Sequence, residues 1–102
     1  MHRVSHEAVT TNLSRMHRDM AQRLRGHAKA DKTIVVRVQP SFAGNGMLLI
    51  ADIDGNISDR CSFVLKNEDV DLAERIGVAI RGNANSQRLA RKALSTLCDH
   101  YM

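Results

Sequence analysis

The fold of this chain is decided by residues 33–65, TIVVRVQPSFAGNGMLLIADIDGNISDRCSFVL. This stretch contains three runs rich in β-branched and aliphatic residues, separated by Gly, Pro, Asn and Asp, which is typical of short strands joined by turns. Alternate residues of a strand point to the same face of a sheet. The apolar positions of the predicted face are Ile34, Val36, Val38, Leu49, Ala51, Ile53, Ile57, Cys61, Phe63 and Leu65. We therefore predict an antiparallel three-stranded meander with one apolar face.

The turn between the second and third strands is predicted at 54–56, Asp-Gly-Asn. Gly and Asn both tolerate the left-handed conformation that such a turn requires. A three-residue turn would set Ile53 opposite Ile57 and Leu49 opposite Cys61. A sheet this small needs another layer on its apolar face, and the flanking segments can supply it.

Three helices are predicted around the sheet. The first covers residues 5–30, with Ser5 as its N-cap. Its apolar positions recur every three or four residues, as on one helix face, and are Val9, Leu13, Met16, Met20, Leu24 and His27. A second helix starts at Asn67 or Glu68 and closes at Arg81-Gly82, and a third runs from a cap at Ser86 to the C-terminus. The fold class is α+β in the order α-β-β-β-α-α, with the helices packed on one face and residues 1–102 forming a single domain.

Composition places the chain among ordinary soluble globular proteins, because 43% of its residues are apolar and 25% are charged. Its longest apolar run, 47–51, is far too short to span a membrane, and the N-terminus lacks the apolar core of a signal peptide. We therefore expect a cytoplasmic protein. Cys61 and Cys98 are expected to be buried reduced thiols, although a disulfide between them stays possible.

Charge is segregated along the chain. Residues 1–37 carry a net charge of +5, residues 38–80 carry −4 and residues 81–102 carry +3. The first helix concentrates this charge in one row, which lies opposite its apolar stripe at about 100° per residue and is about 21 Å long. The row consists of Arg15, Arg18, Gln22, Arg25 and Lys29. No acid of this helix interrupts it, so its like charges repel, and a polyanion would relieve that repulsion. The row can equally be a solvated surface.

The predicted order, with a basic final helix, is similar to that of the double-stranded-RNA-binding domain. The residues that carry this resemblance are SQRLARKAL, 86–94. That module engages RNA through its first helix, a loop between strands and the basic start of its last helix. The acidic helix at 68–82 has no counterpart there. A helix-turn-helix around LAERIGV, 72–78, is disfavoured because its recognition-helix core positions would fall on polar Asn83 and Ser86.

No signature of catalysis or cofactor binding appears in the sequence. The pair Gly44-x-Gly46 opens a strand and no helix follows it, so it is not a phosphate-binding loop. The segment DIDGN, 52–56, lacks the glycine spacing and the glutamate of a calcium loop. His2 and His6 lie in a terminal segment that we expect to fray. We therefore expect no enzyme activity, no cofactor and no metal site.

The favoured hypothesis is a small binding protein that meets nucleic acid or another polyanion through cationic side chains. The predicted contact residues are Arg15, Arg18, Arg25, Lys29, Arg88 and Lys92. The alternative is a regulator or inhibitor that occludes a site on a partner protein, as phage anti-defence proteins do. For this alternative the contact residues would be Phe42, Asp71 and Glu74.

Self-assembly is a third possibility. Exposed apolar side chains would carry it, at Val35, Leu48, Ile50, Val70 and Val78. The second strand is apolar on both faces, and strands of this kind are usually covered on both sides. We therefore expect a homodimer.

Overall fold

The computed structural model describes residues 6–41 and 46–102. The elements follow in the order α1 (His6–Lys29), β1 (Ile34–Pro40), β2 (Met47–Ile53), β3 (Asn56–Leu65), the short 3-10 helix η1 (Asn67–Asp69), α2 (Val70–Ala79) and α3 (Ala84–Asp99). The strands form one antiparallel sheet in the order β1-β2-β3. The predicted α+β class and element order are therefore confirmed. Ser5 and Phe42 lie outside the described residues.

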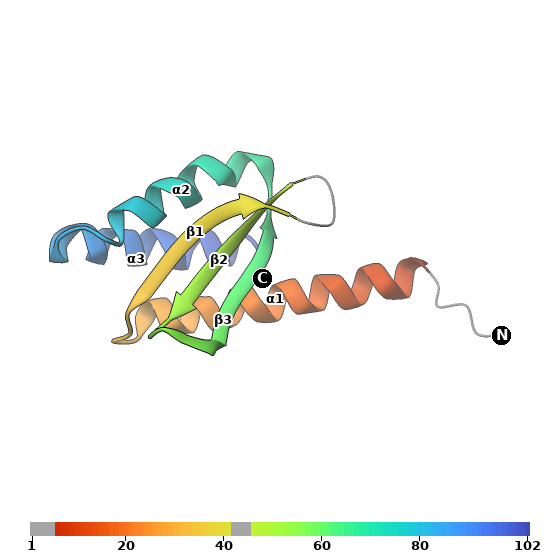
Figure 1. The fold of residues 1–102 in the computed structure, drawn as a ribbon. Coiled ribbons are helices and arrows are strands. Elements are labelled where there is room, and N and C mark those ends of the chain that lie inside the picture. The colour runs from red at the N-terminus through yellow and green to blue at the C-terminus, as the bar shows by residue number, and fades with distance from the viewer. Residues whose placement is uncertain (1–5, 42–45) are drawn as a thin grey trace.

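One face of the sheet carries the core. Helices α1 and α3 lie side by side behind this face, and α2 runs beside β1 (Figure 1). Phe63 is the largest side chain in this core and is 1% exposed. The core residues follow the predicted alternation of strands and helix faces, and those from the sheet are Ile34, Val36, Leu49, Ala51, Ile53, Cys61, Phe63 and Leu65. From α2 and α3 they are Ala73, Ile76, Ala90, Leu94, Leu97 and Cys98, joined by Ile80 just after α2.

The turn between β2 and β3 is shorter than predicted. Ile53 pairs with Asn56, so only Asp54 and Gly55 form the loop. Both have positive φ, 53° and 68°, as a two-residue type I′ turn requires. The Asp54 carboxylate also accepts a 2.8 Å hydrogen bond from the backbone N–H of Thr33, which ties the turn to the start of β1.

The strand register differs from the prediction because β3 contains a bulge. Ala51 pairs with Cys61 and Leu49 pairs with Phe63, not with Cys61. Between the pairs on either side of the bulge, β2 contains one residue and β3 contains the four residues 57–60. Ile57 therefore leaves the core face and is 76% exposed. The predicted alternation is right for residues 61–65 and wrong for Ile57.

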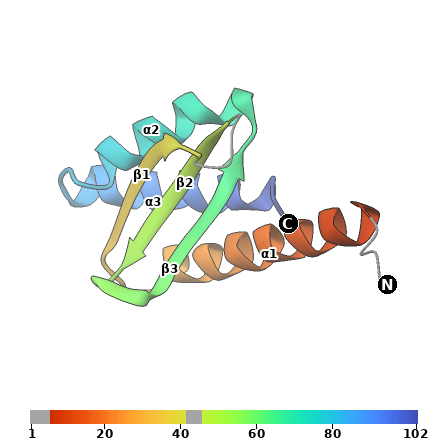
Figure 2. The ribbon, with the colours of Figure 1, turned by 45° about the vertical axis from the view of Figure 1, so that its right-hand side comes forward.

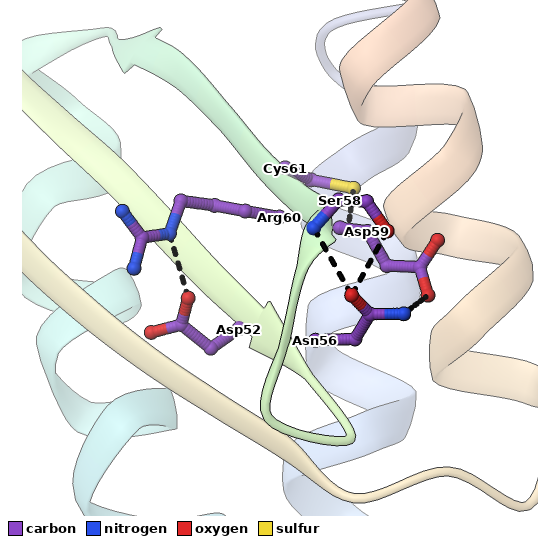
Figure 3. A network of polar contacts seen from close by, with 6 residues as sticks. All are labelled: Asp52, Asn56, Ser58, Asp59, Arg60 and Cys61. Atoms are coloured by element: carbon purple, nitrogen blue, oxygen red, sulfur yellow. Dashed lines mark hydrogen bonds and ion pairs between the residues drawn. The ribbon is translucent and has the colours of Figure 1, made fainter.

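Polar side chains close the bulge on itself, as Figure 3 shows. The Asn56 side-chain oxygen accepts hydrogen bonds from the backbone N–H and the hydroxyl of Ser58, at 3.2 and 2.9 Å. Its amide nitrogen donates to Asp59 at 3.3 Å. Arg60 reaches back to Asp52 of β2, with 2.7 Å between Nε and Oδ1. Of these bonds, the one from the Ser58 N–H gives a partner to a backbone group in the interrupted ladder, and the others join side chains.

The other face of the sheet has no helix over it among the described elements (Figures 1 and 2). Val35, Leu48, Ile50 and Val64 belong to this face by their position in the strand register. Ile50 is nevertheless buried, between its cross-strand neighbours Arg37 and Ser62.

Helix α3 is capped three residues earlier than predicted. Asn83, not Ser86, is the N-cap, and its side-chain oxygen accepts a 2.9 Å hydrogen bond from the backbone N–H of Ser86. An Asn cap of this kind satisfies one of the free donors at a helix start. The short link after α2 makes α3 turn back, so that α3 begins next to the C-terminal end of α1 and the two helices run antiparallel (Figure 2).

Candidate functional site

Helix α1 is rotated relative to its predicted apolar stripe. Its buried residues are Ala21, Leu24 and Ala28, whereas Met20 is only partly buried and Met16 is 56% exposed. At about 100° per residue, the two alanines lie on the side of Leu24 nearer to the basic row. Small side chains let two helices approach closely, which favours packing α3 on this side. The predicted burial of Met16 is wrong; the side chain of Leu13 lies outside the described part of the chain.

This rotation places the C-terminal half of the basic row beside α3 instead of directly opposite the core. Arg25 forms an ion pair with Asp99 of α3, with 2.8 Å between Nη1 and Oδ1. The prediction that no acid interrupts the row holds only within α1, because Asp99 belongs to another helix. Arg15 and Arg18 lie farther along α1, where their side chains are exposed. The N-terminal half of α1 extends past the sheet and the other helices (Figures 1 and 2).

A groove with a volume of about 510 Å³ lies between the end of α1 and the length of α3. We call it the basic groove. Its lining residues are Ala28 and Lys29 from α1, and Ala84, Gln87, Arg88, Arg91, Lys92, Ser95 and Thr96 from α3. Four of these nine are cationic and none is acidic, so the groove has a strongly positive potential. Three of the six predicted contact residues, Lys29, Arg88 and Lys92, meet in it.

Arg91 is the lining residue whose role the sequence did not predict. Its Nη1 donates to the carbonyl oxygen of Ala30 at 3.1 Å, and its Nη2 donates to the carbonyl oxygen of Lys32. The end of a helix leaves backbone carbonyls without intrahelical partners, and Arg91 satisfies two acceptors just after α1. It therefore fixes α1 to α3 and leaves the groove's other cations to face solvent. No local sequence signal reveals a partner about sixty positions away.

Other polar side chains of the groove are hydrogen-bonded within α3 or to the link that precedes it. The Gln87 side-chain nitrogen donates to the carbonyl oxygen of Gly82 at 3.0 Å. The Thr96 hydroxyl donates to the carbonyl oxygen of Lys92 at 3.2 Å. Arg88 donates to the side-chain oxygen of Asn85 at 2.5 Å. These bonds orient the wall formed by α3 and occupy a donor on each of Gln87, Arg88 and Thr96.

The arrangement differs from the one that the double-stranded-RNA-binding resemblance implies. Helix α2 carries the chain from the end of β3 back along β1, so α3 starts at the opposite end of the sheet from the β1–β2 connection (Figure 1). The basic start of α3 therefore lies at the other end of the sheet from the end of β1 and the start of β2. Helix α2, which follows η1 directly after β3, occupies the chain position of the module's last helix, and it is acidic in its first turn.

The residues predicted for protein binding lie elsewhere. Asp71 and Glu74 are exposed on α2, and Asp71 pairs with Arg75 one turn later at 3.2 Å. They line a hollow of about 370 Å³ together with Val78, which is 76% exposed. Phe42 cannot be added to this surface because it lies outside the described residues.

The two thiols are deep in the core. Cys61 and Cys98 are both buried and unpaired. Burial is the main cause that raises the pKa of Cys98 to about 12, with smaller contributions in the same direction from neighbouring Cys61 and Asp99. The predicted reduced state agrees with this environment, and such protonated thiols are poor nucleophiles.

Among residues 6–41 and 46–102, no group of three or more His, Cys, Asp or Glu side chains is placed to hold a metal ion. None of the described helices is long and apolar enough to cross a membrane. No protein-family model, curated protein or solved structure matches this chain.

Proposed function

We propose that this protein binds nucleic acid through the basic groove between α1 and α3. The observation that carries the proposal is the convergence of Lys29 with Arg88, Arg91 and Lys92 in one groove that no acidic side chain lines. Phosphate contacts supply most of the affinity in sequence-independent nucleic-acid binding. Arg and Lys are the side chains that make these contacts.

Two other cations extend the surface. Arg15 and Arg18 are exposed on α1, on the row that leads to Lys29. The distance along the helix from Arg18 to Lys29 is about 16 Å. Arg25 contributes less to this surface than the sequence predicts, because its partner Asp99 neutralises it.

The experiment is a salt titration of binding to mixed-sequence nucleic acid by fluorescence anisotropy. Arg88→Gln with Lys92→Gln removes two exposed groove cations and should lower the affinity. It should also reduce the magnitude of the slope of log K against log salt by about 1.8, since each lost contact to duplex DNA removes about 0.9.

A matched control is Arg37→Gln with Arg81→Gln, which removes the same charge from exposed positions outside the groove. The control variant should keep the wild-type slope. If both double variants lose affinity equally, binding depends on net charge alone and the groove is not the site. Failure of the wild-type protein to bind any nucleic acid at physiological salt would overturn the proposal.

Protein binding is the second candidate, and exposed Val78, which lines one hollow with the carboxylates of Asp71 and Glu74, is the observation that favours it. Leu89 of α3 is also exposed, beside an apolar groove of about 200 Å³ between α2 and α3. Under this candidate, Val78→Asp abolishes biological activity while Arg88→Gln with Lys92→Gln retains it. The reverse pattern would support the nucleic-acid function.

A further inference from the structure

The walls of the basic groove are fixed relative to each other. Arg91 of α3 is bonded to two carbonyl groups that follow α1, and Arg25 of α1 is paired with Asp99 near the end of α3. These two ties hold α1 and α3 at both ends of their contact. Lys29, Arg88 and Lys92 therefore project from two helices that are linked to each other by side-chain contacts as well as by the core.

The groove offers no aromatic surface for stacking. In the described part of the chain the aromatic side chains are Phe63, which is buried, and Tyr101, which lies beyond the C-terminal end of α3 and packs on Phe63. Neither lines the groove. Proteins that bind single strands combine cations with aromatic side chains on which bases stack, each worth about 1–3 kcal/mol. The basic groove has only the cationic half of that arrangement.

The groove is also poorly equipped to read bases. Readout needs free side-chain donors and acceptors in a defined pattern. The side-chain donors of Gln87 and Thr96 are directed to carbonyl oxygens of their own segment, and Arg88 shares its guanidinium with Asn85. Ser95 and the Gln87 side-chain oxygen also line the groove, but most of what remains available is positive charge, which binds phosphate whatever the sequence.

We propose that the basic groove binds the sugar–phosphate backbone of double-stranded nucleic acid and does not discriminate between sequences. This inference rests on the nucleic-acid function proposed above and names its substrate class. A duplex is stiff, with a persistence length of about 50 nm in DNA. It therefore presents regularly spaced phosphates to the groove cations without first having to be ordered. A single strand would lose conformational freedom and gain no stacking in return.

The test compares four ligands of equal length: two DNA duplexes of unrelated mixed sequence, one RNA duplex, and oligo-dT, which has little structure of its own. We expect each protein–duplex complex to be on the order of tenfold tighter than the oligo-dT complex at physiological salt. Two duplexes of unrelated sequence should bind within about twofold of each other, because phosphate contacts carry no base information. The two duplex arms then show whether the B-form or the A-form backbone fits better.

Variants link this preference to the groove. Arg88→Gln with Lys92→Gln should weaken binding to every duplex alike, and Arg37→Gln with Arg81→Gln should not. Equal or tighter binding of oligo-dT would overturn this inference while leaving the nucleic-acid function intact. A strong preference between the two duplex sequences would also overturn it. Absence of binding to all four ligands would remove the proposed function itself.

Discussion

The Tyr101 hydroxyl donates a 2.6 Å hydrogen bond to Oδ2 of Asp69, the one charged side chain that is buried in the described part of the chain. The same hydroxyl oxygen accepts a 2.8 Å hydrogen bond from the backbone N–H of Lys66. Burial raises the pKa of Tyr101 above its usual value, and the bond to Asp69 raises it further. Tyr101, which follows the last helix, thus binds both ends of the short segment between β3 and α2.

Tyr101→Phe should lower the free energy of unfolding by about 1–3 kcal/mol, because it leaves a buried carboxylate oxygen and a backbone N–H without a partner. The ring, whose centroid lies 4.8 Å from that of Phe63, is retained, so the change tests the hydroxyl alone. Urea unfolding measures the loss, with exposed Asp71→Asn as the control. A loss no larger than that of the control would show that water satisfies Asp69 equally well.

Phe63→Ala should cost about 3–5 kcal/mol, the usual range for removing a large aromatic side chain from a core. Phe63 is 1% exposed and lies on the face that α1 and α3 cover. Ile57→Ala is the matched control on the same strand and should have little effect because Ile57 is exposed. Similar losses for the two variants, measured by thermal or urea unfolding, would contradict the observed register.

Gly77→Ala should destabilise the fold, although alanine usually favours helices. A Cβ atom at position 77 would lie 2.7 Å from the carbonyl oxygen of Val36, so α2 would have to move away from β1. Gly26→Ala on α1 is the control, since a Cβ there meets no atom within 4 Å. We expect Gly26→Ala to be neutral or stabilising and Gly77→Ala to lower the melting temperature. A stabilising Gly77→Ala would show that α2 can shift at little cost.

Stability should fall at alkaline pH because of Cys98. The pKa of the Cys98 thiol is about 12 in the folded protein, compared with 9.0 for a fully solvated thiol, as in the unfolded chain. Between these values the unfolded chain loses the thiol proton while the folded chain keeps it, so the contribution is complete below about pH 9 and declines toward pH 12. Its slope is at most about 1.4 kcal/mol per pH unit.

The measurement is the free energy of unfolding as a function of pH, compared between the wild type and Cys98→Ala. Other groups titrate in the same range, and the difference between the two curves isolates Cys98. The difference should shrink as pH rises above about 9. A constant difference would mean that the thiol titrates normally in the folded protein.

Homodimerisation remains a prediction. The reason for it is that no described helix covers the second face of the sheet. Leu48 and Val64 are cross-strand neighbours on this face and are partly exposed. Light scattering over a wide concentration range tests the oligomeric state. If a dimer forms through this face, Leu48→Lys should make it monomeric, whereas Leu89→Lys on α3 should not. A wild-type protein that stays monomeric throughout would contradict the prediction.

The regular parts of the fold were predictable because helix and strand periods repeat within a few residues. That local rule placed Leu49, Ala51, Phe63 and Leu94 in the core, as observed. It failed where the outcome depends on competition between similar local choices. Asp54, Gly55 and Asn56 all suit a turn, and the sequence does not reveal that the bulge that follows favours the shorter loop.

The candidate site was only partly predictable, because its decisive contacts are distant in the sequence. Lys29 and Lys92 could be identified as exposed cations, but nothing local shows that they face one groove. The neutralisation of Arg25 depends on Asp99, and the structural role of Arg91 depends on Ala30. The direction of α3, which brings these residues together, follows from the packing of α2 beside β1.

The bulge and Gly77 together protect the sheet from adding strands. A three-stranded sheet has two edges, and unpaired edges invite intermolecular pairing and aggregation. At β1 the edge is met by α2, which approaches closely because Gly77 has no side chain. At β3 the charged residues Asp59 and Arg60 lie in a segment that has left the regular ladder. We therefore expect features of the backbone to help this small domain resist fibril formation, and we expect substitutions that straighten β3 or enlarge position 77 to weaken that resistance.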